Sequence, residues 1–219
     1  MVVIKKENNG NIIMEYIFIH GLGQNSSSWN ETISNIKNNK KISCPELFSL
    51  FKEKDKNYDN LYSSFVEYCN NINNKLNLCG LSLGGILALN YAIDFPDKIE
   101  SLVLIGTQYK IPKIIFNIQT SIFKLLPNSL FKNFGLHKKD VIQLANSMKN
   151  IDFSNKLEKI KCPVLIICGS KDNLNIKSAK YLYKNIENAK LKIIENTGHV
   201  VNEKNPKILA SELELFYTP

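Results

Sequence analysis

The chain has 219 residues, of which 44% are hydrophobic and 22% are charged, a balance typical of one globular domain with a sizeable core. Its formal charge of +8 would favour a nucleic-acid partner, but all 28 basic residues are lysine. Because bidentate readout of bases and phosphates depends on the guanidinium group, we expect no nucleic-acid binding and interpret the lysines as solvated. No apolar stretch approaches the roughly 20 residues of a spanning helix, so no transmembrane segment is predicted.

Cysteine usage and the N-terminal sequence bear on the compartment. The five cysteines form no Cys-x-x-Cys pair and no ligand-like spacing with the three histidines. This pattern is typical of reduced, buried thiols and predicts neither a disulfide framework nor a metal site. The first apolar run, at residues 12–19, is interrupted by Glu15 and is followed by no small-residue cleavage pattern. We therefore expect no signal peptide and a cytoplasmic protein.

Short strand-like runs alternate with helix-like runs, the pattern of a mostly parallel central sheet flanked by helices. Strands are predicted at residues 2–5, 12–19, 41–44, 76–79, 99–105, 162–168 and 191–194. A first helix is predicted to begin near Ser27 or Ser28, with serine as its N-cap. Further helices are predicted at 59–72, 84–95, 176–186 and 206–216. Residues 107–150 carry apolar, helix-like segments without a strand between them. They are predicted to form a short helical cap inserted in a single α/β domain spanning residues 1–219.

The strongest chemical signal is Gly80-Leu81-Ser82-Leu83-Gly84-Gly85, placed directly between a predicted strand and a predicted helix. A Gly-x-Ser-x-Gly sequence in this context puts the serine on a sharp, strained turn, with its hydroxyl projecting from the carboxyl edge of the sheet. Glycines on either side avoid Cβ clashes, and the following helix brings its N-terminal N–H groups close. Ser82 is therefore predicted to be a nucleophile; the alternative is a glycine-rich loop that merely caps a helix.

A serine hydroxyl needs a base, and His199 is the histidine that lies in a short loop beyond the last predicted strand. Asp172 follows the preceding strand and would emerge at the same carboxyl edge, where it would orient the imidazole and stabilise the imidazolium. We therefore predict a catalytic triad of Ser82, Asp172 and His199. The alternatives are a turn aspartate and a loop histidine, each without a catalytic role.

A tetrahedral intermediate also needs hydrogen-bond donors for its oxyanion. The amide of Leu83, the residue after the nucleophile, is one predicted donor, and the amide of Leu22 after the early strand is the second. His20 is predicted to brace this loop through hydrogen bonds, because Ser82 already has a better-placed base.

Together these motifs resemble those of the α/β-hydrolase family, in its small serine esterase and lactonase-like branch. His20-Gly21-Leu22-Gly23 with Trp29 is similar to the family's oxyanion segment, and residues 80–85 are similar to its nucleophile elbow. Residues 92–99 resemble the helix end that follows the elbow, while residues 162–172 and 198–199 resemble the segments that carry the acid and the base.

The resemblance runs from about residue 12 to the C-terminus and implies an α/β-hydrolase fold with neither a metal nor an organic cofactor. It also implies substrate contacts at Gly21 and Trp29, and at Phe116 and Phe123 in the cap. Many relatives carry Asp-x-x-Gly-x-Gly-x-Ser where this chain has Cys44-Pro45-Glu46-Leu47-Phe48. One wall of the acyl pocket is therefore not predicted.

The leading functional prediction is a hydrolase that cleaves a small-molecule carboxylic ester or thioester through an acyl-enzyme intermediate. Two alternatives remain open. The same triad could serve a C–C bond hydrolase, a lyase or a cofactor-free haloperoxidase-like activity, and the same scaffold could serve a non-catalytic ligand-binding or signalling protein. Ser82 argues against haloalkane dehalogenases and epoxide hydrolases, whose elbow nucleophile is an aspartate.

The predicted cap has an asymmetric charge. From Ser101 to Lys139 the chain contains no aspartate or glutamate, whereas it contains Lys110, Lys113, Lys124, Lys132, Lys138 and Lys139. One interpretation is an amphipathic lid whose lysines are solvated. The other is a lid that receives an acyl chain presented by an acidic carrier or an anionic lipid surface, which predicts hydrolysis that slows as ionic strength rises.

Overall fold

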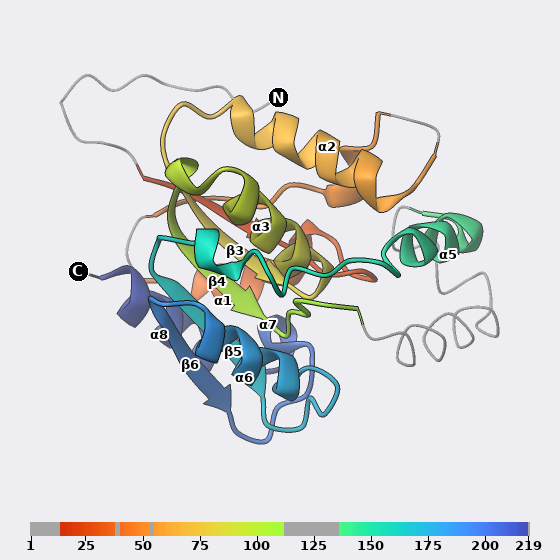
Figure 1. Ribbon diagram of the computed structural model, residues 1–219. Helices are drawn as coiled ribbons and strands as arrows, with labels where there is room; N and C mark the ends of the chain where they lie inside the picture. Colours follow the sequence, from red (N-terminus) through yellow and green to blue (C-terminus); the bar gives the residue numbers. More distant parts are fainter. Residues whose placement is uncertain (1–13, 38–39, 53–54, 112–135, 219) are drawn as a thin grey trace.

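The computed structural model describes residues 14–37, 40–52, 55–111 and 136–218 (Figure 1). Within them a six-stranded sheet has the order β2-β1-β3-β4-β5-β6, and each pair of neighbouring strands is parallel. The strands are β1 (Glu15–Ile19), β2 (Lys41–Ser43), β3 (Leu76–Leu81), β4 (Ile99–Ile105), β5 (Val164–Gly169) and β6 (Ala189–Ile194). The predicted fold class, a parallel sheet flanked by helices, is confirmed.

The α-helices are α1 (Asn30–Ser34), α2 (Tyr58–Asn70), α3 (Leu83–Asp94), α5 (Lys138–Ser147), α6 (Ile176–Asn185), α7 (Val201–Lys204) and α8 (Pro206–Tyr217). Short 3-10 helices cover Ser26–Trp29, Leu47–Ser49, Pro96–Lys98 and Leu157–Lys159. No helix among the described residues combines the length and the apolar character needed to cross a membrane.

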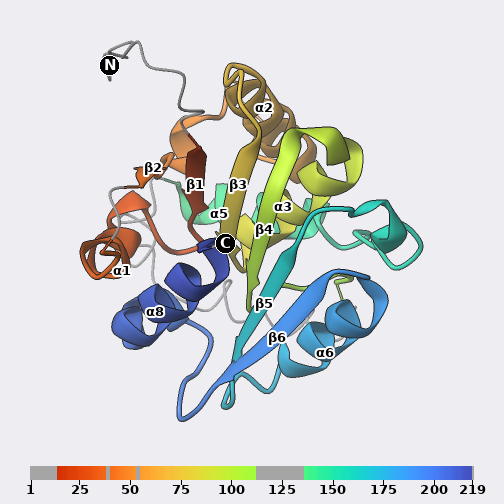
Figure 2. The same cartoon turned by 90° about the vertical axis from the view of Figure 1, so that its left-hand side faces the viewer.

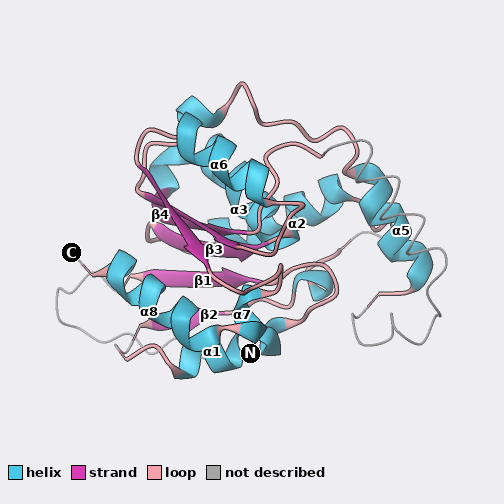
Figure 3. Ribbon diagram, turned by 90° about the horizontal axis from the view of Figure 1, so that it is seen from below, coloured by secondary structure: helices cyan, strands magenta, loops and turns pink. Residues whose placement is uncertain are grey.

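Helices cover both faces of the sheet, with α2, α3 and α6 on one side and α1, α7 and α8 on the other (Figures 2 and 3). Side chains alternate between the two layers along each strand: Leu102 and Leu104 join the core beneath α3, whereas Val103 and Ile105 join the core beneath α8. Burial on both faces explains why the central strands are almost continuously apolar in sequence.

The predicted strands and helices match the described elements closely, with two differences in the first half of the chain. The predicted strand at 2–5 lies outside the described residues. The serine N-cap is wrong: Asn25 is the cap, because its side-chain oxygen accepts the N–H of Ser27 at 3.0 Å and so starts a 3-10 helix ahead of α1. Strand β3 continues to Leu81, because Gly80 still pairs with both β1 and β4.

Two further differences concern short or incompletely described segments. Helix α7 was not predicted, because four residues are too few to show helical periodicity. Of the stretch predicted as a cap, residues 112–135 lie outside the described part. The rest contains α5 and an antiparallel bridge between Lys110 and Asp152. The extent of the cap and of the single domain remain predictions.

The strand order contains a reversal of direction between β1 and β3. From β1 the chain moves to β2 at the sheet's margin, and then returns to the opposite side of β1 to form β3. The connections therefore leave the carboxyl ends of β1 and β3 in opposite directions. Such a switch in direction is where parallel α/β sheets bind ligands.

Candidate active site

Ser82 lies at this switch point, between the end of β3 and the first residue of α3. Its backbone has φ 54° and ψ −114°, a strained conformation for a residue with a side chain. The Ser82 N–H donates to the carbonyl of Ile105 at the end of β4, at 2.9 Å. The residue is partly exposed.

The glycines around Ser82 are required by close backbone approach. A Cβ at Gly80 would lie 2.3 Å from the carbonyl oxygen of Gly84, and a Cβ at Gly84 would lie 2.2 Å from that of Ile19. Because backbone atoms cannot move aside as a flexible side chain does, any larger residue would push α3 away from β3 or β1. The physical reason predicted for these glycines is confirmed.

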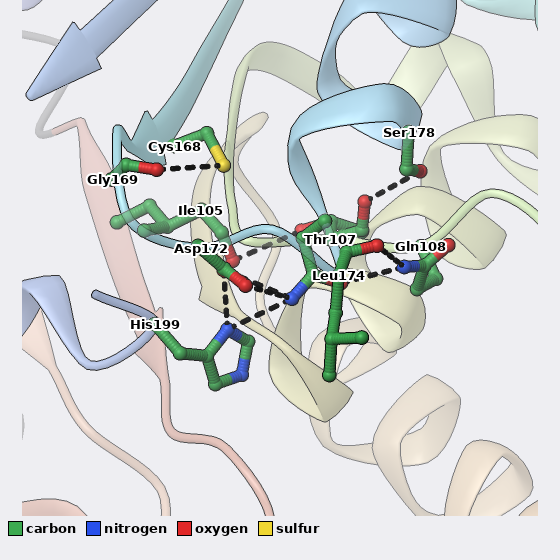
Figure 4. A network of polar contacts seen from close by, with 10 residues as sticks. Ile105, Thr107, Gln108, Cys168, Gly169, Asp172, Leu174, Ser178 and His199 are labelled. Atoms are coloured by element: carbon green, nitrogen blue, oxygen red, sulfur yellow. Dashed lines mark hydrogen bonds and ion pairs between the residues drawn. The ribbon is translucent and has the colours of Figure 1, made fainter. Parts of the chain in front are cut away.

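Asp172 and His199 are joined directly, with the Asp172 Oδ2 atom 2.7 Å from His199 Nδ1 (Figure 4). The Asp172 side chain is only 4% exposed, whereas that of His199 is 37% exposed. The imidazole therefore has its Nδ1 side anchored on a buried carboxylate while the ring remains accessible. Gly106, with φ 53°, packs against the ring: a Cβ there would lie 2.9 Å from His199 Nδ1.

Backbone contacts hold the loops that carry the acid and the base together. The N–H of Ser170 donates to the Ile194 carbonyl at 2.9 Å, and the N–H of Lys171 donates to the Thr197 carbonyl at 2.8 Å. A Cβ at Gly169 would lie 2.3 Å from the carbonyl oxygens of Thr197 and Gly198. The ends of β5 and β6 thus bring Asp172 and His199 together although 27 positions separate them in sequence.

The structure brings Ser82 to the same edge but does not bond it to His199. Both residues border the end of β4: Ile105 accepts the Ser82 N–H, and the neighbouring Gly106 contacts the His199 ring. Within the described residues the Ser82 hydroxyl makes no hydrogen bond. Nucleophile–base contacts often tighten only when substrate binds, so the missing bond does not exclude His199 as the base.

The predicted oxyanion donors lie on either side of Ser82. Leu83 is the first residue of α3, so its N–H has no carbonyl partner within the helix. The Leu22 N–H has no backbone partner among the described residues. Gly21, next to Leu22, packs against the nucleophile: a Cβ there would lie 3.4 Å from Ser82 Cβ. Among the described residues, both amides therefore lack a backbone partner and belong to segments next to Ser82.

His20 is fully buried directly beneath this loop. Its Nδ1 lies 3.0 Å from the Gly21 carbonyl, and its Nε2 accepts the Leu47 N–H at 3.1 Å. Burial lowers the pKa of the imidazole, although the nearby Glu46 carboxylate acts in the opposite direction. A neutral ring with Nδ1–H donating to Gly21 satisfies both backbone contacts, although Nε2 also lies 3.1 Å from Glu46 Oε1, which would favour a proton on Nε2. The contacts to the backbone are the loop brace predicted from sequence.

Sequence reasoning missed a second brace on the same loop. The Gln24 Oε1 atom accepts the Gly21 N–H at 3.1 Å. The Gln24 Nε2 atom donates to Asn202 Oδ1 at 3.1 Å and to Glu203 Oε1 at 2.7 Å. Both acceptors belong to α7, just after His199 in the chain. Gln24 therefore connects the loop beside Ser82 to the segment that carries the base, and no motif in the sequence indicated it.

The structure corrects one predicted substrate contact and leaves others outside its range. Trp29 is fully buried and packs edge-on against Phe18 at 5.1 Å, in the core beneath the sheet. It has no surface left to offer a substrate, because the 3-10 helix Ser26–Trp29 turns the indole inward against β1. Phe116 and Phe123 lie outside the described residues. Among the described side chains, no three of His, Cys, Asp or Glu gather as a metal would require.

Comparison with known families gives a match over most of the chain. The model of the family described as BAAT / Acyl-CoA thioester hydrolase C terminal matches residues 62–205. This range contains Ser82, Asp172 and His199.

Two curated relatives are similar over nearly the whole chain. Monoacylglycerol lipase ABHD6 of Mus musculus is 24% identical, over 87% of this chain and 71% of its own length. The pimeloyl-[acyl-carrier protein] methyl ester esterase of Wigglesworthia glossinidia brevipalpis is 25% identical, over 91% of this chain and 92% of its own length.

Solved structures share the fold. The enol-lactonase from Burkholderia xenovorans LB400 superposes with a TM-score of 0.83 at 16% identity, covering 97% of this chain and 94% of its own. MenH from S. aureus superposes with a TM-score of 0.78 at 18% identity, covering 96% of both chains. These neighbours share the sheet and helix arrangement described above. At such low sequence identity, the likeness shows the fold alone.

Proposed function

Because the chain belongs to the BAAT / acyl-CoA thioester hydrolase C-terminal family and has the α/β-hydrolase fold, we propose that it is a serine hydrolase cleaving carboxylic esters or thioesters. The observation that carries this proposal is the 2.7 Å contact between buried Asp172 and accessible His199, at the edge where strained Ser82 emerges. A buried acid, an oriented base and an exposed serine at one sheet edge support acyl transfer.

The proposed reaction proceeds in two halves. Ser82 Oγ attacks the acyl carbon while His199 Nε2 takes the hydroxyl proton, and His199 then gives that proton to the departing alcohol or thiol. Water next attacks the acyl-enzyme with His199 again as the base, which releases the carboxylic acid and restores Ser82. Asp172 keeps Nδ1–H directed toward itself, so that Nε2 faces the serine, and stabilises the imidazolium.

The amides of Leu22 and Leu83 are the proposed oxyanion donors. Each lacks a backbone partner as described above, and preorganised donors of this kind lower the barrier without reorganising during the reaction. The N-terminus of α3 adds its dipole on the same side. Gly21 is proposed to border the acyl group, because it lies against Ser82.

Two features support a narrower form of this proposal, in which an acidic carrier presents the acyl substrate. One curated relative acts, by its name, on a pimeloyl group attached to an acyl-carrier protein. The stretch from Ser101 to Lys139 contains lysines but no carboxylate side chain. Within it Lys110 is paired with Asp152 at 2.6 Å, so its own attraction for an anionic partner would be reduced. An anionic lipid surface would be attracted by the same charges.

The test compares wild-type protein with Ser82→Ala on p-nitrophenyl esters from acetate to laurate. We expect Ser82→Ala to lower kcat by at least about 10³-fold, with an unchanged circular dichroism spectrum. Ser63→Ala, on the exposed side of α2, is the matched control and should behave as wild type. The chain length with the highest kcat/KM reports the size of the acyl pocket.

A second arm replaces the ester with an acyl group on an acidic carrier protein. Its turnover should fall as ionic strength rises, whereas turnover of the neutral esters should not. Equal salt dependence for both would remove the carrier from the proposal. Folded protein without turnover on any ester or thioester would contradict the hydrolase and favour a C–C hydrolase or lyase, or a binding protein.

A further inference from the structure

Asn175 occupies the N-cap position of α6 but does not cap the helix. Asparagine is favoured at N-caps because its side-chain oxygen accepts a free N–H of the first turn. Here the Asn175 side chain makes no such bond, and its backbone is already in the helical region. The residue is 7% exposed. Its buried amide therefore serves some other group.

That group is the Asp172 carboxylate. The Asn175 Nδ2 atom lies 2.8 Å from Asp172 Oδ1 and 2.9 Å from Oδ2, so one amide donates across both oxygens. The same nitrogen lies 3.1 Å from His199 Nδ1. Because Nδ1–H already donates to Asp172, Asn175 Nδ2 and His199 Nδ1 are two donors packed side by side around the same carboxylate, and they do not bond to each other. Asn175 thus closes a triangle with the acid and the base.

Gln108 decides which way the Asn175 amide points. Its Nε2 atom donates to Asn175 Oδ1 at 2.7 Å and to the Leu174 carbonyl at 2.9 Å (Figure 4). With its oxygen held by Gln108, Asn175 can present only N–H groups to Asp172. A flipped amide would place an oxygen against the carboxylate and lose both bonds. The contacts form a chain from Gln108 through Asn175 and Asp172 to His199.

We propose that Asn175, oriented by Gln108, is a positioning residue that fixes the Asp172 carboxylate and moderates its negative charge toward His199. This inference rests on the proposed function. Hydrogen bonds to an ionised carboxylate stabilise its charge, and so weaken its pull on the imidazolium proton. They also stop the carboxylate from rotating, which keeps Oδ2 aligned with Nδ1. Asn175 contacts neither the nucleophile nor the predicted oxyanion donors among the described contacts.

The other titratable neighbour of this cluster is neutral. Burial raises the pKa of the Cys168 thiol to about 12, with the Asp172 charge acting in the same direction, so the thiol stays protonated at neutral pH. Lys171 and Lys177, near the same loop, are exposed to solvent. Asp172 is therefore the charge that His199 meets directly, and a change in its hydrogen bonds should be felt by the imidazole.

The experiment measures the His199 imidazole by NMR titration, alongside the pH profile of kcat/KM, in wild type and Asn175→Leu. Without the amide donors, we expect the titration midpoint of His199 and the acidic limb of the profile to move up by about half to one pH unit. We expect kcat to fall about tenfold, because the carboxylate is freer to rotate. Asn173→Leu is the matched control: this exposed residue on the same loop should leave both readouts at wild-type values.

Gln108→Met keeps Asn175 but releases its oxygen, and should shift the same midpoint in the same direction by less. This variant reports on the proposal if Asn175→Leu does not fold. An unchanged His199 midpoint in both variants would overturn the proposal, even if their stability fell. The titration needs no substrate, so it gives its answer whether or not the protein hydrolyses esters.

Discussion

The candidate site has two halves that are built differently. In the acid–base half, backbone contacts join the two loops, and the functional side chains Asp172 and His199, with Asn175 and Gln108, also bond to one another at 2.7 to 2.9 Å. In the nucleophile half, Ser82 with the amides of Leu22 and Leu83, no corresponding side-chain bonds occur among the described residues. The backbone positions these groups: glycines let α3, β1 and β3 approach closely, and the side chains of His20 and Gln24 hold the backbone of the loop that carries Leu22.

The difference follows from what each half is proposed to do. A buried carboxylate needs partners at all times, because an unpaired buried charge is costly. A nucleophile and oxyanion donors must instead be unpaired before substrate arrives, since any internal partner would compete with it. Their geometry therefore has to come from the backbone. This comparison predicts that the two halves will fail in different ways when they are altered.

The largest expected effect is from Gly84→Ala, in the nucleophile half. The new Cβ would lie 2.2 Å from the Ile19 carbonyl oxygen and 2.7 Å from that of His20. Neither obstacle is a flexible side chain, so we expect a loss of about 3 kcal/mol in the free energy of unfolding. Activity should be lost as well, because the elbow shifts. Urea unfolding followed by circular dichroism measures the first effect.

Gly198→Ala is the control in the acid–base half. It adds the same methyl group next to His199, where a Cβ meets nothing within 4 Å. We expect the free energy of unfolding to be unchanged or slightly raised. Comparable destabilisation by both substitutions would mean that backbone closeness does not distinguish the two halves.

An intermediate effect is expected from Gln24→Leu, which cuts the connection between the halves. The substitution leaves the buried N–H of Gly21 without its acceptor and frees the loop from Asn202 and Glu203. We expect kcat to fall about tenfold, with KM little changed, because the Leu22 amide loses its alignment. Steady-state kinetics on the best p-nitrophenyl ester gives both parameters.

Ser27→Ala is the matched control on the same loop, since Ser27 is exposed and its hydroxyl contacts only the Asn25 side chain among the described residues. A Gln24→Leu enzyme with the kcat of this control would show that the two halves work independently.

The smallest expected effect is a pH dependence of stability from His20, beneath the nucleophile half. Burial lowers its pKa below the 6.5 of an unfolded chain, so the unfolded chain binds a proton at higher pH than the folded protein. Stability is therefore complete above pH 6.5 and decreases as the pH falls below it. Glu46→Gln removes a charge that favours protonation, so the decline should extend to lower pH than in wild type. Urea midpoints between pH 7 and 5 measure this, and identical curves would exclude His20 as the cause.

Local patterns in the sequence predicted much of the molecule. The apolar run at 99–105 coincides with β4, because a strand covered on both faces needs apolar residues at successive positions. The elbow at 80–85 was predicted from its glycines, because close approach of a strand and a helix requires glycine at fixed spacing. The positions of Asp172 and His199 after successive parallel strands placed them at one edge.

The sequence did not reveal the side chains that connect distant segments. Gln24 and Asn202 lie 178 positions apart, and Gln108 and Asn175 lie 67 apart. A hydrogen bond between such residues has no period and no fixed spacing, so it leaves no pattern to read. Trp29 shows the same difficulty: its place in a familiar motif suggested a substrate contact, whereas packing against Phe18 turned it into the core.

The sequence by itself determined the parallel α/β architecture, the strained serine and the chain order of Ser82, Asp172 and His199. Periodicity, glycine spacing and the direction of each strand can be inferred from short segments of the sequence, without knowledge of the tertiary contacts. Only the tertiary structure decided that Asn175 faces Asp172 instead of capping α6, and that Gln24 spans from Gly21 to α7. These choices depend on which segments meet at the edge of the sheet, and that meeting exists only in the folded molecule.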